Sequence, residues 1–177
     1  STKDKISQLS FLVKNETGYK NLIYLSSISY LNKGSDIGIT IKDLENNSEG
    51  LFCFLGGEYN PLMILHNDNK NTDELVNIFK KLFKNNLLFE LQRIDDSEID
   101  SFEKFLIKKS NEFNIPLVGT NNIKFGEQEE FAAHDALLCV AQKTTINNGS
   151  RKTSNNQIAF KNDQEMIELF SDIPEII

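Results

Sequence analysis

The sequence predicts an α/β protein built from parallel strand–helix units. Short apolar runs with strand character alternate with longer segments whose apolar residues recur at helical spacing. Strands that alternate with helices in steps of roughly 30 residues are typical of parallel β/α architecture. A complete β/α barrel usually needs about 200–250 residues. The 177-residue chain is therefore expected to form either a small open sheet or a piece of a barrel.

The N-terminal half contains two strand–helix pairs. The run SFLV at 10–13 is a short strand, and a helix is expected over 17–32. Its predicted inward stripe comprises Tyr19, Leu22, Ile23, Ser26 and Tyr30. The apolar run GLFCFLGG at 50–57 indicates a buried strand closed by glycines. The clearest helix is expected over 72–85, with Asn71 or Thr72 as its cap. Its predicted stripe comprises Leu75, Ile78, Phe79, Leu82 and Phe83.

The C-terminal half contains two further pairs. A strand at 87–92 precedes a helix at 96–113 that Asp96 or Ser97 would cap. The predicted inward residues of this helix are Ile99, Phe102, Phe105, Leu106 and Phe113. A strand at 115–120 precedes a helix at 129–142, and the polar stretch 143–157 is expected to be an exposed loop. Residues 162–177 indicate a short helix and a second helical start, which Asp172 would cap.

Composition excludes several classes of protein. The net charge is −7, so the chain alone is not expected to bind nucleic acid through a basic surface. No apolar run approaches the ~20 residues of a membrane helix. Cys53 and Cys139 lie in apolar runs, which is typical of reduced, buried thiols in a cytosolic protein.

Few residues suggest chemistry on their own. His66 is expected in a polar loop, and His134 lies on a helix without a second ligand at i+3 or i+4, so a zinc site is not expected. The segment LGGE at 55–58 fits a tight turn and also a phosphate contact. Glu90 and Gln92 share one face of a strand, which is either the polar mouth of a barrel or ordinary surface.

Six segments, taken in order, resemble a known family. They are KNETGYKNL (14–22), EGLFCFLGG (49–57), FELQR (89–93), IPLVGTNNIKF (115–125), AHDALLCV (133–140) and ELFSDIPE (168–175). Over nearly its whole length the chain resembles the polymerase-and-histidinol-phosphatase (PHP) domain of the bacterial DNA polymerase III alpha subunit. The resemblance implies a single partial domain over 1–177, lacking the family's N-terminal H-x-H stretch. It also implies part of a distorted, TIM-like (β/α) barrel of seven strands.

The resemblance further implies a degenerate metal-site rim formed by Glu90, Gln92, Ile94, Asn122 and Lys124. Family members with an active site usually continue the strand ending in ELQ as Q-N-H, and here Ile94 stands at the histidine position. Where they carry N-D-x-H after the fourth strand, this chain has Asn122 for the aspartate and Lys124 for the second histidine. An amide is a weak metal ligand and an ammonium group has no lone pair. No catalytic residue and no bound metal or other cofactor is therefore expected in this chain.

The function implied by the resemblance is that of an inactive scaffold within a cytoplasmic, replicative DNA polymerase. It would dock the proofreading exonuclease subunit beside the remaining polymerase III subunits. DNA synthesis, its Mg²⁺ and the DNA contacts would belong to the parent protein. Two alternatives stay open here: a metal-dependent phosphoesterase or 3'-5' exonuclease, and an unrelated small α/β binding protein. The isolated chain is also expected to self-associate through the exposed edge of strand 10–13.

Overall fold

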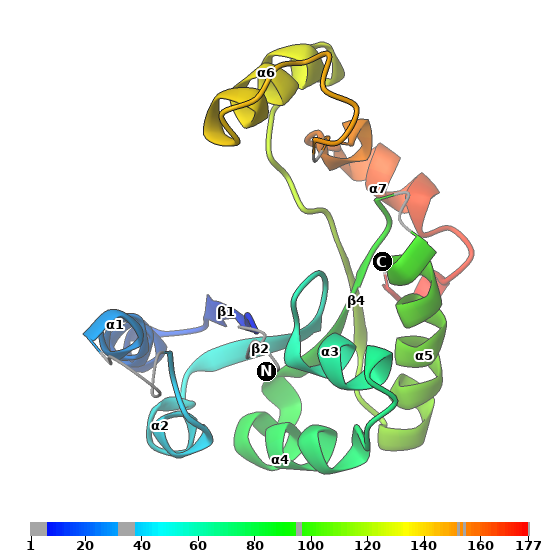
Figure 1. Cartoon of the computed structure of the whole chain (residues 1–177). Helices are drawn as coiled ribbons and strands as arrows, with labels where there is room; N and C mark the ends of the chain where they lie inside the picture. The colour runs from blue at the N-terminus through cyan, green and yellow to red at the C-terminus, as the bar shows by residue number, and fades with distance from the viewer. Residues whose placement is uncertain (1–6, 32–37, 95–96, 152, 154, 177) are drawn as a thin grey trace. The chain divides into compact units, whose positions relative to one another are not determined.

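The computed structural model describes residues 7–31, 38–94, 97–151, 153 and 155–176. They form two compact units, here called unit 1 (Ser1–Glu90 with Leu106–Leu117) and unit 2 (Leu91–Phe105 with Val118–Ile177). The strands are β1 (Ser10–Val13), β2 (Leu51–Gly56), β3 (Leu87–Gln92) and β4 (Leu117–Thr120). The helices are α1 (Glu16–Leu31), α2 (Ile41–Asn47), α3 (Pro61–Asn67), α4 (Asp73–Phe83), α5 (Ser97–Phe113), α6 (Phe131–Ala141) and α7 (Asp163–Leu169) (Figure 1).

The strands form a four-stranded sheet in the order β1-β2-β3-β4. β2 and β3 pair in parallel, with Cys53 opposite Leu87, as the alternating strand–helix pattern predicts. The prediction of an entirely parallel sheet is wrong at β1, which pairs antiparallel with β2, Ser10 facing Phe54 and Val13 facing Leu51. β1, for which an exposed edge was expected, thus pairs with β2 along one of its two edges. The chain is a mixed α/β protein, and its predicted single-domain extent over 1–177 stays a prediction.

The turn from β1 into α1 explains why β1 lies against β2. The Asn15 side chain caps α1 by accepting a hydrogen bond from the Gly18 backbone N–H at 3.0 Å. Lys14 donates its backbone N–H to the Gly50 carbonyl at 2.8 Å, just before β2 begins. A Cβ at Gly18 would lie 1.8 Å from that carbonyl oxygen, and Gly50 itself has a φ of 74°. Both glycines are therefore required for the two chain segments to approach this closely.

Two short helices of unit 1 were not predicted. α2 begins with a capping box, in which Thr40 and Asp43 each accept a backbone hydrogen bond from the other. α3 begins with Asn60 as its cap and Pro61 in its first turn. His66 lies in the last turn of α3, so its assignment to a polar loop is wrong.

The core of unit 1 forms around β2, β3 and α4. Leu51, Cys53 and Leu55 of β2 have no exposed surface, and Phe89 of β3 has none either. The inner faces of these strands are therefore covered within unit 1. On α4 the residues that bury completely or nearly so are Val76, Phe79 and Phe83, whereas the predicted Leu75, Ile78 and Leu82 are half-buried. Asn71 accepts a hydrogen bond from the Asp73 backbone N–H at 3.0 Å, and Thr72 makes no side-chain cap.

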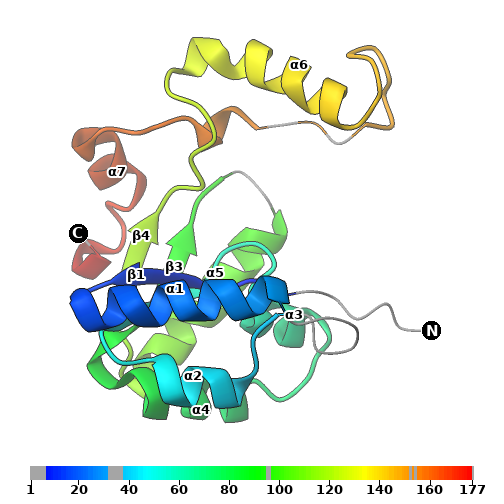
Figure 2. The same cartoon turned by 90° about the vertical axis from the view of Figure 1, so that its left-hand side faces the viewer.

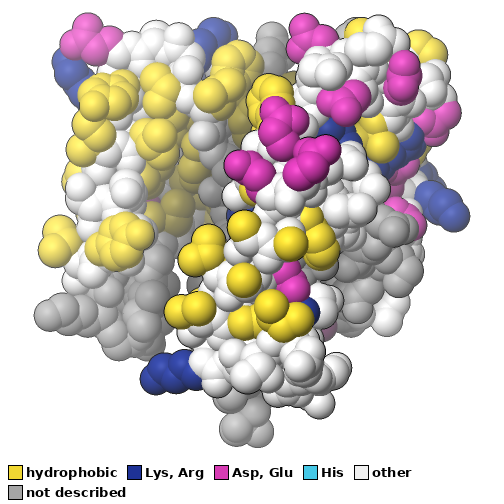
Figure 3. Space-filling view, turned by 90° about the horizontal axis from the view of Figure 1, so that it is seen from above, with side chains coloured by type: hydrophobic (Ala, Val, Ile, Leu, Met, Phe, Trp, Pro, Cys, Tyr) yellow, Lys and Arg dark blue, Asp and Glu magenta, His cyan; other side chains and the backbone are white. Residues whose placement is uncertain are grey.

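The predicted inward stripe of α1 is largely exposed. Tyr19 is 58% exposed, Ile23 50% and Tyr30 85%, while Gly18 and Leu25 face the core. α1 lies beside α2 (Figure 2), and its buried residues Gly18 and Leu25 lie outside the predicted stripe. Figure 3 shows the resulting line of hydrophobic side chains along α1.

In unit 2, α6 departs from ordinary amphipathic packing. α6 buries Asp135 and Cys139 and exposes Leu137 (67%) and Val140 (74%), and Figure 3 shows hydrophobic side chains over this helix. The polar loop that follows α6 folds back along it (Figure 2), and the Arg151 guanidinium binds both carboxylate oxygens of Asp135 at 2.6 Å. The bidentate pair satisfies a carboxylate that would otherwise be buried without a counter-charge.

The predicted cap of α5 at Asp96 or Ser97 lies outside the described side chains. Of its predicted inward residues, Ile99, Phe102 and Leu106 are buried, whereas Phe105 and Phe113 are half-buried. Within the described ranges, no helix combines the length and the apolar character needed to cross a membrane.

Candidate functional site

The predicted rim residues fall in both units: Glu90 in unit 1, and the other four in unit 2. In unit 1, Glu90 of β3 is 8% exposed and lies next to Gly56 of β2. A Cβ at Gly56 would lie 2.0 Å from the Glu90 carbonyl oxygen, so this glycine allows close strand packing. The next residue, Gly57, has a φ of 72°. A tight turn therefore explains the two glycines of LGGE, and the buried carboxylate beside them is unfavourable for phosphate.

In unit 2, the loop that follows β4 is tied to a distant segment. Lys124 donates its backbone N–H to the Ile158 carbonyl at 3.0 Å, and Phe125 forms an isolated parallel bridge with Ala159. The Asn121 side-chain amide donates to the Ala159 carbonyl at 2.5 Å. Ile158 and Ala159 directly follow the stretch 143–157 that was predicted to be a polar loop, and their pairing with the strand end was not predicted.

The other rim residues of unit 2 surround the same strand ends. The Gln92 side-chain amide donates to the Thr120 hydroxyl at 3.4 Å. Ile94 is 8% exposed, and its carbonyl accepts a hydrogen bond from the Asn155 side-chain amide. Asn122 is half-buried and the Lys124 side chain is exposed.

The donor set of these residues does not fit a divalent cation. Ile94 offers only a hydrocarbon side chain at its position, Asn122 only a neutral amide, and Lys124 a cation that repels a metal ion. Over the part of the chain that the structure describes, three or more His, Cys, Asp or Glu side chains nowhere gather in a metal-binding group. His66 and His134 lie on different helices, α3 and α6, and the His134 ring packs 5.2 Å from that of Phe125.

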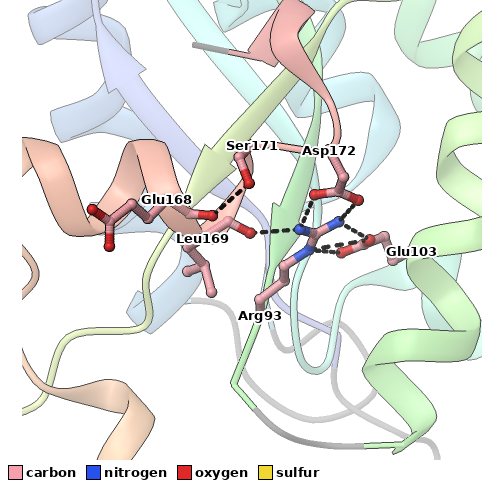
Figure 4. Close-up of polar contacts among 6 residues, drawn as sticks. All are labelled: Arg93, Glu103, Glu168, Leu169, Ser171 and Asp172. Carbon is pink, nitrogen blue, oxygen red and sulfur yellow. Dashed lines mark hydrogen bonds and ion pairs between the residues drawn. The ribbon is translucent and has the colours of Figure 1, made fainter.

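A cluster around Arg93, absent from the predictions, occupies the end of β3 in unit 2. The Arg93 guanidinium donates to Glu103 of α5 at 2.7 Å and 3.0 Å, and to Asp172 at 2.5 Å and 2.8 Å. It also donates to the Leu169 carbonyl at 2.5 Å, and its central carbon lies 4.9 Å from the centroid of the Phe170 ring. Figure 4 shows the carboxylates of Asp172 and Glu103 both directed at the guanidinium.

The electrostatics of this cluster are those of a structural clamp. Hydrogen bonds to Asp172 and Glu103 raise the pKa of Arg93 further above its usual value, and the hydrogen bonds from Arg93 lower the pKa of Asp172. The Arg93 and Glu103 side chains are 20% and 14% exposed, whereas that of Asp172 is 63% exposed. Asp172 was predicted only as a helix cap. Its partner Arg93 is too distant in sequence for spacing to reveal it.

The two cysteines are structural. Cys53 is fully buried, and burial raises the pKa of its thiol far above the ordinary value. Cys139 is 5% exposed on α6. Both thiols are free, in agreement with their apolar sequence context.

Comparison with known proteins identifies relatives over the whole chain. The family model described as "PHP domain" matches residues 1–94. The chain is 35% identical over 176 residues to the DNA polymerase III subunit alpha of Rickettsia bellii (strain RML369-C), covering 97% of this chain and 15% of the relative. It is 36% identical over 185 residues to the subunit of the same name from Borreliella burgdorferi, covering 99% of this chain and 16% of the relative. The chain thus spans about one sixth of the length of these relatives. The alternative of an unrelated small α/β binding protein is wrong.

Proposed function

The chain belongs to the PHP domain family, and from this premise we propose that it is the PHP portion of a DNA polymerase III alpha subunit whose metal site has degenerated. Similarity to alpha subunits along 97% of the chain supports the first part. The side chains at the strand ends support the degeneration of the metal site, because Ile94, Asn122 and Lys124 together supply no anionic ligand. The parent protein would carry out DNA synthesis in the cytoplasm, with Mg²⁺ bound by its polymerase domain.

In this proposal the four strands are part of the family's distorted seven-stranded barrel, which the remainder of the parent polypeptide would complete. The portion would act as a scaffold that docks the proofreading exonuclease subunit next to the other polymerase III subunits. Its net charge of −7 disfavours direct DNA binding, so the parent's other domains would supply the DNA contacts. The clamp around Arg93 supports a scaffold role because its ion pairs join the end of β3 to Glu103 of α5 and to Asp172 of the C-terminal segment.

Two measurements test the proposal. The purified chain, supplied in turn with Mn²⁺, Zn²⁺ and Mg²⁺, should not hydrolyse p-nitrophenyl phosphate or shorten single-stranded DNA from its 3' end. The exonuclease subunit encoded in the same genome should co-elute with the chain in size-exclusion chromatography. Stoichiometric binding of manganese or zinc together with metal-dependent hydrolysis would instead support the phosphoesterase or exonuclease alternative. In that case the buried Glu90 would be a metal ligand. Failure to co-elute would contradict the docking role.

A further inference from the structure

The C-terminal part of unit 2 leaves an apolar hollow open to solvent. It has a volume of about 330 Å³ and is lined by Gly119, Asp163, Met166, Ile167, Phe170 and Ile176. Phe170 is 1% exposed, whereas Ile167 is 42% exposed. A partly exposed isoleucine on α7 beside a half-buried methionine is apolar surface that folding has not covered.

The shape of the hollow depends on Gly119 of β4. A Cβ at this position would lie 2.7 Å from Cε2 of Phe170 and 3.0 Å from Cγ2 of Ile176. Glycine therefore lets the phenylalanine ring and the C-terminal segment pack directly on the strand. The Arg93 clamp holds the neighbouring residues Leu169 and Asp172, so this segment is fixed before any partner arrives.

The segment that supplies most of the lining, residues 162–177, is acidic, and the one charged residue among the described residues that line the hollow is Asp163. Residues 162–177 contain five acidic residues and no Lys or Arg: Asp163, Glu165, Glu168, Asp172 and Glu175. Three of the five have an intramolecular role, since Glu165 completes the cap of α7, Glu168 accepts from Gln164, and Asp172 binds Arg93.

The other two acids, Asp163 and Glu175, are exposed and make no ion pair with any residue that the structure describes. Asp163 lines the hollow itself. Its carboxylate is thus available to a positive charge brought by a partner.

This combination of shape and charge selects the chemistry of an occupant. A volume of about 330 Å³ is at the small end of ligand pockets, so it suits a side-chain anchor better than a whole cofactor. Asp163 and the acidic segment around it repel phosphate, which disfavours nucleotides, nucleic acids and anionic lipid. Lysine and arginine satisfy both features, because their hydrocarbon stems cover apolar surface while their charged ends meet carboxylates.

We propose that this hollow is a docking site for a basic segment of a partner protein. The segment would insert one aliphatic side chain between Ile167 and Ile176 and place Lys or Arg against Asp163 and Glu175. The chain's net charge of −7 would steer such a partner toward it. The identification of this partner as a polymerase subunit rests on the proposed docking role.

The test uses fluorescein-labelled synthetic peptides of sequence GSKRLKRSG, GSKRSKRSG and GSEELEESG, with fluorescence anisotropy as the readout. The leucine peptide should bind at least fivefold more tightly than the serine peptide, and the acidic peptide should not bind. Ile167→Ser and Asp163→Asn should each weaken binding of the leucine peptide at least fivefold. The controls Leu137→Ser and Glu129→Gln change an exposed apolar and an exposed acidic residue that do not line the hollow, and each should alter the affinity for the leucine peptide less than twofold.

Three results would overturn the site. The first is equal affinity for the leucine and serine peptides. The second is an equal loss of peptide affinity in the hollow variants and in their controls. The third is a dimer of the chain that Ile167→Ser alone dissociates, because the occupant would then be a second copy. Co-elution with the exonuclease subunit distinguishes a failure of the proposed site from a failure of the proposed docking role. If it co-elutes with the wild-type chain and equally with Ile167→Ser, the docking role stands and the site is wrong. If the peptides discriminate as expected and the subunit does not co-elute, the site stands and the role is wrong.

Discussion

Replacing Arg93 by alanine should destabilise the protein more than any loss of a surface ion pair. The substitution removes the guanidinium and leaves the Glu103 carboxylate, 14% exposed, without its counter-charge. Breaking a buried pair by removing one partner costs roughly 3–5 kcal/mol. The bond to Asp172, whose side chain is 63% exposed, adds at most about 1 kcal/mol. Because the guanidinium remains partly exposed, the lower end applies, and Arg93→Ala should cost about 3 kcal/mol.

Urea denaturation followed by circular dichroism measures this loss directly. A loss of about 3 kcal/mol in a chain of this size corresponds to a fall in Tm of about 6–12 °C. Arg93→Lys should recover only part of the loss, because an ammonium group cannot make two bidentate pairs at once. The control is Lys20→Ala, which removes an exposed pair with Glu16 at 2.8 Å and should cost less than about 0.5 kcal/mol. If Arg93→Ala cost no more than Lys20→Ala, the clamp would not organise unit 2 and the reasoning would be refuted.

The same clamp gives a pH dependence of definite sign. Because Arg93 lowers the pKa of Asp172, the carboxylate stabilises the folded state at pH values above its unfolded pKa of about 3.9. This contribution is lost as the pH falls through the lower folded pKa. The stability difference between the wild type and Asp172→Asn should therefore be constant from about pH 5 to 8 and shrink below about pH 4. A difference that persists unchanged at pH 2 would mean that Asp172 acts through packing rather than charge.

Three further predictions concern other parts of the chain. Phe79→Ala should cost about 3–5 kcal/mol in urea denaturation, since Phe79 is 1% exposed and stacks on Phe83 at 5.9 Å; a loss below about 1 kcal/mol would mean that the site collapses without a cavity. Lys124→His should not create metal binding measurable by calorimetry, because one imidazole cannot replace a ligand set; tight zinc binding would contradict this. Light scattering of the isolated chain should give about twice the 20.2 kDa monomer mass, since β1 lies at the edge of the sheet with Leu12 58% exposed. Leu12→Lys should then give a monomer. A monomeric wild-type chain would refute dimerisation through the edge of β1.

The sequence predicted the longer elements because their patterns repeat. β3 has the predicted bounds, and α4, α5 and α6 lie within one or two residues of the predicted ones. The short helices α2 and α3 were missed although their signals are present, the capping box of Thr40 and Asp43 and the Asn60–Pro61 start. Seven residues give too few repeats for periodicity to reveal a helix.

The errors arise where tertiary structure decides between local alternatives. α1 carries apolar residues on more than one face, and the face with Gly18 packs inward because only a glycine allows contact with Gly50. No periodicity argument weighs that contact. The Arg93 cluster joins residues separated by 10 and 79 positions, so local spacing contains no signal for it. The degeneracy of the rim, by contrast, could be proposed from the sequence alone, because it depends on residue identity rather than on geometry.

Several of the motifs that carry the family resemblance make contacts that hold the fold of this protein together. In N-x-T-G-Y the asparagine caps α1 and the glycine admits the Gly50 backbone, which also accounts for the glycine of EGLFCFLGG. In F-x-D-I-P-E the aspartate binds Arg93, the last residue of FELQR, and the phenylalanine ring packs on the same guanidinium. These contacts need no metal ion and involve none of Ile94, Asn122 or Lys124. A chain can therefore lose every metal ligand at the strand ends while the contacts that define its fold persist. This separation supports the proposal that the PHP portion keeps a docking surface without a working metal site.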